Sequence, residues 1–481
     1  MARCCVSRDA RFTRIAETVE SQFPEIAESQ PELLARHSTA AGLSEKAAGL
    51  WAKAGQRSLA RSALVEAAEQ IKRALDQIAT LPGTPGLLRE QIKLQVALAN
   101  ALMHTTGYAT PETKAALDQA RALIERAEAL GEAPEDPLLI FSILYGFWAA
   151  NLVAFNGSAL RELAMQFVTL AEKQMATGPR MIGHRLMATS LTATGELVEG
   201  LAHYDQALAV YDPAEHRPLA TRFGQDVRVV ILSFRSWVLW VLGYPDAARA
   251  DSLHSLEDAR EIKQAATLIY ALFSAPCTFM LCGDYVAANA LTDELLALAD
   301  EKAFLFWRAY GAVYRGCLAT LTGNASEGAN LMNSAITELR LRWATSWMPL
   351  WLSHLARAYA QAGQLDDAWR SSSEAIAAVE RTKERIFEAE VYRATGEIAL
   401  MGPHPSAAKA ETYFDRALAV ARQQQAKSWE LRAAMSMARL WRGQGKLQQA
   451  RELLAPVYGW FTEGFDTLDL KEAKALLDEL A

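Results

Sequence analysis

The sequence predicts an all-α fold: a right-handed α-solenoid of stacked antiparallel helix pairs with a repeat of about 40 residues. Three observations predict it. Apolar residues make up 51% of the chain, with abundant alanine and few of the alternating β-branched runs that mark strands. Glycines recur every forty residues through the middle of the chain, and small residues stand at a constant distance from each of them. Such internal periodicity indicates a repeat architecture.

The glycines fix the register of the repeat. Four of them are spaced by forty residues, and one more precedes this strict series by forty-eight; they are Gly195, Gly243, Gly283, Gly323 and Gly363. Glycine adopts the left-handed backbone conformation that ends a helix at little steric cost. Each of these glycines is therefore expected to end the first helix of a pair and to begin the turn into the second.

Small residues stand at the fifth position after each glycine of the strict series. They are Ala248, Ala288, Gly328 and Ala368. Two helices approach closely only where neither carries a long side chain at the crossing point. These positions are therefore expected to lie at the crossings. Stacked pairs would then bury the apolar faces that a single pair leaves exposed.

The spacings resemble the tetratricopeptide repeat, in which small residues and a glycine stand at these offsets. That repeat has 34 residues, so a repeat of about forty residues implies longer helices or longer connections. The resemblance also implies a concave surface lined by the first helix of each pair.

Four segments are expected along the chain. They are an N-terminal helical segment over residues 1–36, N-terminal helical repeats over 37–135, the tetratricopeptide-like solenoid over 136–464 and a C-terminal capping helix over 465–481. The last of these has charged residues along one face, as expected of a helix that covers the end of a stack.

Local patterns predict further elements outside the strict series. Apolar residues at three- and four-residue steps predict helices over residues 57–80 and 111–131, the second with Pro111 in its first turn. Proline- and glycine-containing stretches predict loops at 131–137 and 211–218.

Charge and cysteine content exclude several protein classes. The chain has 49 basic and 56 acidic residues, a net charge of −7, which gives no support for nucleic acid as its main ligand. The five cysteines are odd in number and irregularly spaced, which argues against a disulfide framework or a zinc ribbon. Cys277 and Cys282 are expected to be packing residues. The first twenty residues carry charges where a signal peptide needs an apolar segment, so a cytoplasmic protein is expected.

One stretch is a candidate membrane span. Residues 138–155 contain no charge and approach the length that a bilayer requires. The alternative is a helix buried on most sides within the helical array. Asn156 and Gly157 end the stretch as a turn would, so we favour the buried helix and expect no membrane span.

Motifs for catalysis are absent from the sequence. It has neither of the glycine-rich phosphate-binding patterns, no H-E-x-x-H, no histidine–cysteine pair at ligand spacing and no nucleophile elbow. No catalytic, cofactor-binding or metal-binding residue is therefore assigned, and the chain is not expected to be an enzyme.

Aromatic residues gather on the predicted concave surface. The tetratricopeptide pattern places on that surface the residues thirteen, ten, six and three positions before each glycine. A partner-binding groove is predicted there, formed by Trp237, Trp240, Tyr270, Phe273 and Tyr310, with Arg185 and Arg357 flanking it. Such surfaces commonly bind a peptide or a helix of a partner. The alternative is that these aromatic side chains pack inside thick, superhelically coiled repeats.

Three stretches carry a more specific resemblance. They read "AGQRSLARSALVEAAEQIKRALDQIATLPGTP", "AEHRPLATRFGQDVRVVILSFRSWVLWVLGYPDAA" and "AKSWELRAAMSMARLWRGQGKLQQARELLAPVYGWFTEGFDTLDLKEAKALLDEL". They resemble the C-terminal tetratricopeptide region of large bacterial proteins that join a class III adenylate/guanylate cyclase domain to an AAA-type ATPase module. The stretch "RFTRIAETVESQFPEIAESQPELLARH" resembles the helical end of the ATPase module.

The resemblance implies a regulatory role without catalysis. In that family the cyclase and ATPase activities belong to two upstream domains, and neither the aspartate-containing cyclase motif nor the ATPase phosphate loop occurs in this sequence. The chain is therefore expected to be the regulatory tail alone, as a fragment or a split gene product.

Two functional hypotheses remain open. In the first, the chain is a scaffold that binds a protein or peptide, either a separate partner or a cyclase/ATPase polypeptide. In the second, it is a ligand-sensing or inhibitory module that controls a cyclase or ATPase in trans.

Overall fold

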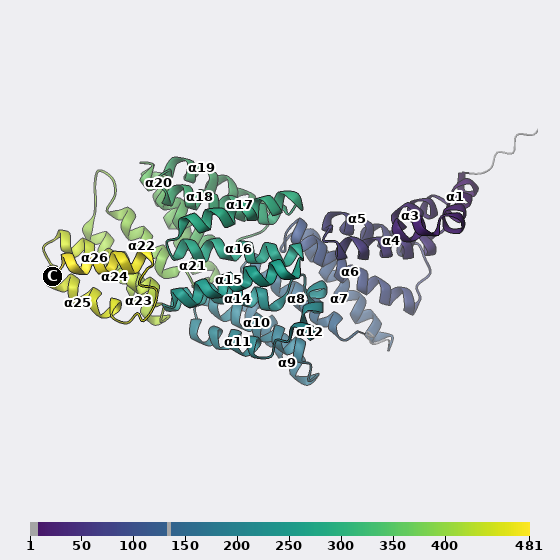
Figure 1. Cartoon of the computed structure of the whole chain (residues 1–481), viewed down its shortest axis with the longest axis horizontal. Helices are drawn as coiled ribbons and strands as arrows, with labels where there is room; N and C mark the ends of the chain where they lie inside the picture. Colours follow the sequence, from purple (N-terminus) through teal and green to yellow (C-terminus); the bar gives the residue numbers. More distant parts are fainter. Residues whose placement is uncertain (1–7, 132–135) are drawn as a thin grey trace, which may run out of the picture. The chain divides into compact units, whose positions relative to one another are not determined.

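The computed structural model describes residues 8–131 and 136–481, and these residues form helices and connecting turns without a strand among them (Figure 1). The predicted all-α solenoid is confirmed. Residues 1–7, with Cys4 and Cys5, and residues 132–135 of the predicted loop lie outside the described residues.

The chain forms two compact units, which are described separately. The first comprises residues 1–147 and 221–224, and the second comprises residues 148–220 and 225–481. The sequence predicted a boundary after residue 135, whereas the division between the units falls inside a helix, after Phe147.

The first unit is a series of helices in which neighbours along the chain pack together. Its helices are α1 (Arg8–Gln22), α2 (Pro24–Ser29), α3 (Pro31–Ala40), α4 (Ser44–Ala60), α5 (Leu64–Ala79), α6 (Pro85–Thr105), α7 (Pro111–Ala129), the first part of α8 (Leu138–Val153) and most of α13 (Ala220–Phe223). Leu139 and Ile143 of α8 join a buried cluster with Ile92 of α6 and Ile124 of α7. This packing holds the start of α8 in the first unit.

One local prediction in this unit is wrong. The stretch predicted as a single helix over residues 57–80 is divided between α4 and α5, because Ser62 adopts a left-handed φ of 57°. A residue in that conformation ends a helix. The two helices therefore pack as a hairpin, whereas the sequence pattern suggested one continuous rod.

The second unit contains the predicted repeats. Its helices are the end of α8, then α9 (Gly157–Lys173), α10 (Thr177–Thr194), α11 (Leu197–Ala209), α12 (Pro213–His216), α14 (Val227–Leu242), α15 (Pro245–Ile262), α16 (Ala265–Leu281), α17 (Tyr285–Glu301), α18 (Leu305–Leu321), α19 (Ala325–Leu341), α20 (Met348–Gln361), α21 (Leu365–Thr382), α22 (Glu388–Ala399), α23 (Ala407–Gln423), α24 (Lys427–Gly443), α25 (Leu447–Tyr458) and α26 (Leu468–Glu479). The stretch predicted as a loop over 211–218 contains the short helix α12.

The repeat glycines have the predicted backbone. All five lie in the turns between paired helices with left-handed φ values: 101° for Gly195, 100° for Gly243, 81° for Gly283, 99° for Gly323 and 79° for Gly363. The length of the repeat comes mainly from its helices, since each of α16 to α19 has 17 residues.

The small residues lie where the paired helices cross. Ala248, Ala288 and Ala368 have no exposed surface, and Gly328 is also buried. A Cβ on Gly328 would lie 2.6 Å from the carbonyl oxygen of Gly316 on the partner helix. No side chain fits at that distance, so the predicted close packing is confirmed at this crossing.

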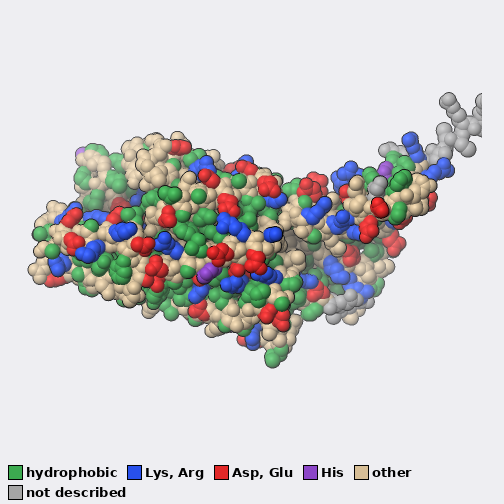
Figure 2. Space-filling model, viewed as in Figure 1, with side chains coloured by type: hydrophobic (Ala, Val, Ile, Leu, Met, Phe, Trp, Pro, Cys, Tyr) green, Lys and Arg blue, Asp and Glu red, His purple; other side chains and the backbone are tan. Residues whose placement is uncertain are grey.

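The candidate membrane span is a packed helix. Phe141 and Trp148 of α8 are buried. Within the described parts of the chain, no helix combines the length and the apolar character that crossing a bilayer requires. On the face shown in Figure 2, acidic and basic side chains are interspersed over the described residues.

The repeats of the second unit curve back on themselves. Helix α24 contacts α14, and the rings of Trp240 and Trp429 lie 4.6 Å apart at this contact. The Ser428 hydroxyl donates a hydrogen bond to the Trp240 carbonyl, and the Arg432 guanidinium donates to the Leu281 carbonyl at 2.9 Å. We call this contact between α24–α26 and α14–α17 the seam.

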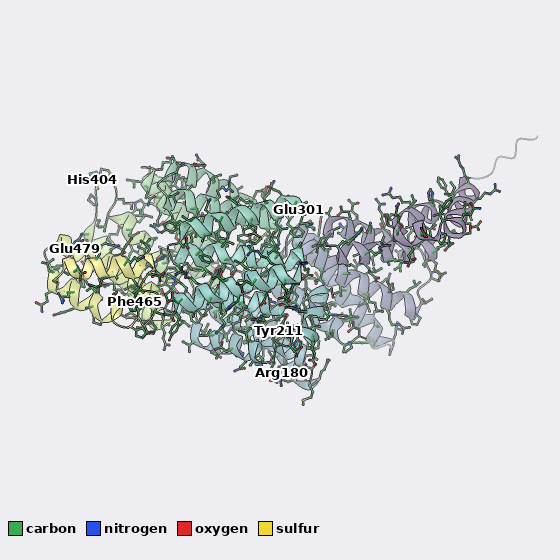
Figure 3. The ribbon with its side chains drawn as sticks, viewed as in Figure 1. Arg180, Tyr211, Glu301, His404, Phe465 and Glu479 are labelled. Atoms are coloured by element: carbon green, nitrogen blue, oxygen red, sulfur yellow. The ribbon has the colours of Figure 1, made fainter. Side chains whose placement is uncertain are left out.

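The segment between α25 and α26 extends the seam to the start of α15. The Glu463 carboxylate accepts hydrogen bonds from the backbone amides of Asp246 and Ala247 at 2.9 and 3.1 Å. The Gly464 amide donates in return to the Asp246 carboxylate at 2.9 Å. Phe465, labelled in Figure 3, lies in the same segment. A carboxylate at a helix N-terminus is favoured by the free amides and the helix dipole.

Candidate binding cavity

The aromatic residues predicted to form a groove are buried. Trp237, Trp240, Tyr270, Phe273 and Tyr310 are each at most 6% exposed, and so is Arg185. An exposed groove at these residues is therefore not what the structure shows, and the alternative interpretation describes their positions correctly. They pack inside a superhelically coiled array.

These aromatic residues contact one another across neighbouring repeats. The Phe273 ring lies 5.7 Å from the ring of Trp237 and 4.9 Å from that of Tyr310. The Trp237 indole donates to the Ser274 carbonyl at 3.0 Å. Burial raises the pKa of Tyr310, whose hydroxyl lies 3.2 Å from that of Ser346. The Trp237 indole and the Tyr310 hydroxyl thus have polar neighbours inside this core, as most buried polar groups do.

Two connections supply the side chains that fill the predicted groove. Trp347 precedes α20 and Phe387 precedes α22, and both are buried. The Trp347 ring lies 5.2 Å from that of Trp237, and the Phe387 ring lies 6.2 Å from that of Trp429. The helices of the seam and these two connections together occupy the space that an open solenoid would leave for a partner.

Arg185 also has a packing role. Its guanidinium lies over the ring of Trp148, 5.2 Å from the centroid, and the Trp148 indole donates to Ser190 at 3.0 Å. A cation over an indole face is favourable, more so away from water. Arg185 therefore belongs to the interior of the array.

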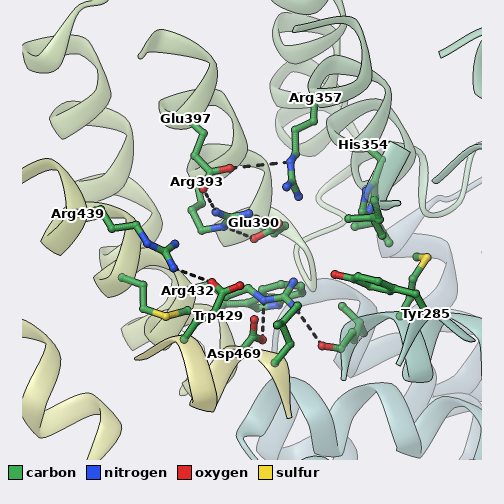
Figure 4. Close-up of a pocket in the computed structure, with 17 residues that line it drawn as sticks. Tyr285, His354, Arg357, Glu390, Arg393, Glu397, Trp429, Arg432, Arg439 and Asp469 are labelled. Atoms are coloured by element: carbon green, nitrogen blue, oxygen red, sulfur yellow. Dashed lines mark hydrogen bonds and ion pairs between the residues drawn. The ribbon is translucent and has the colours of Figure 1, made fainter. Parts of the chain in front are cut away.

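A charged cavity of about 150 Å³ lies beside the seam (Figure 4). Helices α16, α17, α18, α20, α22, α24 and α26 contribute to its walls. Its ionisable side chains are Arg357, Arg393, Arg432, Arg439, Glu390, Glu397, Asp469, Glu472, His354 and Tyr285. Of the residues predicted to bind a partner, only Arg357 lines this cavity.

The innermost charged pair is Arg393 with Glu390, both on α22. The guanidinium donates two hydrogen bonds to the carboxylate, at 2.6 and 2.7 Å, and the side chains are only 8% and 3% exposed. Burial raises the pKa of Glu390, but the charge and hydrogen bonds of Arg393 outweigh it and hold the pKa at about 2. Arg393 also donates to Glu397. Arg393 is thus held by two carboxylates of its own helix.

Arg432 connects the cavity to the seam. It donates to Asp469 of α26 at 2.8 Å, and its guanidinium lies 4.7 Å from the ring centroid of Trp240 and 5.3 Å from that of Trp429. Burial raises the pKa of Asp469 even though Arg432 lowers it. With its bond to the Leu281 carbonyl, Arg432 ties α24 to three other helices.

Arg439 and Glu472 form the most solvent-exposed of these ion pairs. The Arg439 guanidinium donates to Glu472 at 2.6 Å, and the side chains are 41% and 44% exposed. The charged pairs thus run from a buried floor on α22 to an accessible rim on α24 and α26.

Three side chains of the cavity that can donate hydrogen bonds are held less tightly by the protein. The Arg357 Nε lies 3.9 Å from Glu397, beyond hydrogen-bonding distance. Burial lowers the pKa of His354 to about 3, so its ring is neutral near pH 7. Burial raises the pKa of Tyr285, so its hydroxyl keeps its proton. Figure 4 shows all three side chains around the same space.

An apolar pocket of about 400 Å³ adjoins the charged cavity. It shares Glu397 and Arg439 with the cavity, and Leu400, Phe414 and Leu440 line it further out. The two shared side chains therefore stand between a charged space and an apolar one.

Histidine, cysteine and acidic side chains do not cluster as metal ligands in the part of the chain that the structure describes. Among the described residues, no three or more histidine, cysteine or acidic side chains are grouped to hold a metal ion. Cys277, Cys282 and Cys317 are buried as free thiols, and burial raises the pKa of Cys282 to about 12. Cys277 and Cys282 are packing residues, as predicted.

The remaining cavity residues were missed by the sequence analysis. One signal could have found two of them: the offsets that located the concave surface, counted back thirteen and six positions from Gly445, give Arg432 and Arg439. The acidic residues on α26 had no comparable signal, because α26 meets the cavity only through the closure of the array.

The chain is similar in sequence to an uncharacterized bacterial protein. No protein-family model matches the chain. An uncharacterized protein of Rhizobium meliloti (strain 1021), R02095, is 24% identical over 413 residues, which cover 85% of this chain and 39% of that protein. The chain thus spans less than half the length of this relative.

Solved structures of helical-repeat proteins are similar to the chain. A Rap protein complexed with Competence and Sporulation Factor has a TM-score of 0.52 and 13% identity, covering 82% of this chain and all of that one. The Rap conjugation gene regulator of plasmid pLS20, in complex with the Phr* peptide, has a TM-score of 0.47 and 11% identity, covering 83% of this chain and 97% of that one. At 13% identity, the likeness to the first of these structures concerns the fold alone.

Proposed function

We propose that the chain is a non-catalytic tetratricopeptide-like scaffold that binds a protein partner and forms the regulatory part of a bacterial cyclase/ATPase signalling system. The observation that carries the proposal is the charged cavity, because it brings together side chains from separate repeats of an array whose other concave positions are filled. The Rap protein of similar fold was solved in complex with Competence and Sporulation Factor, which supports a binding role.

The chemistry of the cavity supports binding over catalysis. Its best-placed acids and bases are paired with each other: Glu390 with Arg393, Asp469 with Arg432 and Glu472 with Arg439. A general base works best with a pKa near the operating pH. The pKa values of Glu390 and His354, about 2 and about 3, are far below it.

The resemblance to cyclase–ATPase proteins supplies the proposed partner. The part of the relative that aligns with this chain is 39% of its length, which leaves space in that protein for further domains. A cyclase or ATPase polypeptide, joined to the chain or separate from it, is the partner that we propose. Such a role would place the chain in the bacterial cytoplasm.

A second candidate is a ligand-sensing or inhibitory module acting in trans on a cyclase or ATPase. The small size of the cavity favours it, because 150 Å³ admits a small group but not a helix. A ligand that contacts α20, α22, α24 and α26 at once would bias the closure of the array, and that closure could be read by an enzyme.

The test is direct binding to a polypeptide carrying the class III cyclase and AAA-type ATPase domains from the same organism. We expect a complex with a Kd of about 10 μM or tighter, and about tenfold weaker binding by Arg439→Glu at the rim of the cavity. Arg370→Glu, at an arginine side chain that is 76% exposed on α21, is the matched control and should bind as the unaltered chain does.

Absence of a complex at about 100 μM protein would refute the scaffold proposal. Turnover of ATP to cyclic AMP by the chain alone would refute its non-catalytic character.

A further inference from the structure

We infer that the charged cavity binds a carboxylate group, held by Arg357, His354 and Tyr285. This inference deepens the proposed binding function, on which it rests, by naming the chemistry that the cavity recognises. The four arginines of the cavity differ in how closely they are paired with acids of the array.

Three of the arginines are held by acids of the array itself. Arg393 makes a two-bond contact with Glu390, Arg432 donates to Asp469, and Arg439 donates to Glu472. An incoming anion would have to break these charge-assisted hydrogen bonds to use those arginines.

Arg357 is in a different position. Its contact with Glu397 is 3.9 Å long, and Glu397 already accepts a hydrogen bond from Arg393 and another from Ser436 at 3.2 Å. The Arg357 side chain is 22% exposed, so solvent reaches it. Its planar guanidinium can meet both oxygens of a carboxylate at the cost of one weak contact.

Two neutral donors line the same cavity as Arg357. His354 precedes it by less than one turn of α20, and Tyr285 reaches the cavity from α17. Among the described residues, neither the Tyr285 hydroxyl nor the His354 ring makes a hydrogen bond within the protein. A carboxylate bound to Arg357 would accept from these groups as well, as anions in proteins do.

The charge balance of the cavity favours a monoanion. Its four arginines face four acids, Glu390, Glu397, Asp469 and Glu472. A monoanion therefore leaves one negative charge in excess, and the loosely held Arg357 is the cation nearest to hand for it. A phosphate dianion leaves two negative charges in excess, and like charges within a few ångströms repel strongly away from water.

The dimensions define what carries the carboxylate. A cavity of about 150 Å³ is large enough for a molecule of about the size of benzene. That space suits a carboxylate with a short carbon chain. The adjoining pocket at Leu400, Phe414 and Leu440 suits apolar groups attached to it. The carboxylate could come from a free short-chain carboxylic acid or from an acidic side chain of a protein partner.

The experiment is isothermal titration calorimetry of the full chain at pH 7 with four probes. They are butyrate, a blocked pentapeptide with a glutamate between leucines, the same peptide with glutamine, and inorganic phosphate. We expect butyrate, the glutamate peptide or both to bind, and the glutamine peptide and phosphate to bind at least about tenfold more weakly. Binding of butyrate alone identifies a free acid as the source, and binding of the peptide alone identifies a side chain.

Variants locate the site. Arg357→Ala and Tyr285→Phe should each weaken carboxylate binding, by about tenfold or more for the arginine. Arg370→Ala, at the exposed arginine on α21, should leave it unchanged. Tyr285→Phe removes one oxygen atom, so it tests the site even if Arg357→Ala fails to fold.

The inference is overturned if neither carboxylate probe binds to the folded chain at about 10 mM, if phosphate binds as tightly as they do, or if both variants bind unchanged. These results are separable from those on the proposed function. Carboxylate binding without a complex with the cyclase/ATPase polypeptide would refute the scaffold proposal and support the carboxylate site. A complex without carboxylate binding would refute the carboxylate site alone.

Discussion

Turns at the same position of the repeat differ in what surrounds them. A Cβ on Gly243 would lie 2.5 Å from the Trp460 ring, and one on Gly283 would lie 2.4 Å from the Cβ of Leu468. A Cβ on Gly323 or Gly363 would meet nothing within 4 Å. All four glycines have the same left-handed backbone. The difference comes from the seam, which covers the first two turns and leaves the other two open.

The comparison shows that this array is not a chain of nearest-neighbour contacts. In an open solenoid each repeat contacts only the repeats beside it, and stability is close to a sum of local terms. Here α24 contacts α14 as well as its neighbour α22. Substitutions at the seam are therefore expected to cost more than equivalent substitutions in the open turns.

The largest expected effect is that of Arg432→Ala. The substitution leaves the half-buried Asp469 without its cation and removes the guanidinium from the two tryptophan rings, so we expect the free energy of unfolding to fall by about 3 kcal/mol. Urea denaturation followed by tryptophan fluorescence measures the loss.

The matched control for that variant is Arg439→Ala. It lies two turns further along α24 and pairs with Glu472 on the same partner helix, but its pair is exposed, so a loss below about 1 kcal/mol is expected. Equal losses for the two variants would show that the seam contributes no more than the solvent-exposed rim.

The next effect compares two glycines. Gly283→Ala combines a left-handed backbone with the clash against Leu468, and we expect it to destabilise the protein by about 2–3 kcal/mol. Gly323→Ala has the backbone strain alone and should cost about 1 kcal/mol. Thermal melting of both variants tests the difference, and equal melting temperatures would contradict the assigned role of the seam.

The smallest of these effects depends on pH. The folded pKa of His354, about 3, lies below its unfolded value of 6.5 because the side chain is buried and the positive charge of Arg357 lies nearby. Below pH 6.5 the unfolded chain binds a proton that the folded chain does not. Stability is therefore complete above pH 6.5 and falls with pH, by about 2 kcal/mol between pH 6.5 and 5.

His354→Gln should remove that part of the pH dependence. The groups that face the ring are Arg357 on the same helix, Glu390 and Arg393 on α22, and Arg432 on α24. Urea midpoints of the two proteins at several pH values provide the measurement. Parallel curves between pH 6.5 and 5 would show that the ring gains its proton in the folded protein too.

The array was predictable from the sequence because its causes are local. A glycine such as Gly283 must end its helix wherever the helix goes, and a small residue such as Ala288 must mark a close crossing. These constraints act within one hairpin. They set the register of the helices without any knowledge of distant contacts.

The site was less predictable because its causes are distant in the chain. Arg357 was found since its offset from Gly363 faces the axis of the array, but Asp469 lies more than a hundred residues further on. The closure of the array also explains why the aromatic residues are buried. Trp237 was assigned to an open surface by a rule for open solenoids, and Trp347 and Phe387 cover it here. The prediction of a single helix over residues 57–80 was wrong for a local reason. Serine rarely adopts the left-handed backbone that Ser62 has between α4 and α5.

The seam has a consequence for how this sequence could evolve. An open solenoid can gain or lose a hairpin in the middle and still stack, since every junction looks alike. In this protein an added or deleted hairpin would carry Trp429 and Arg432 past Trp240 and Leu281 and leave both sides without partners. The number of hairpins between α14 and α24 is therefore fixed by the geometry of the seam.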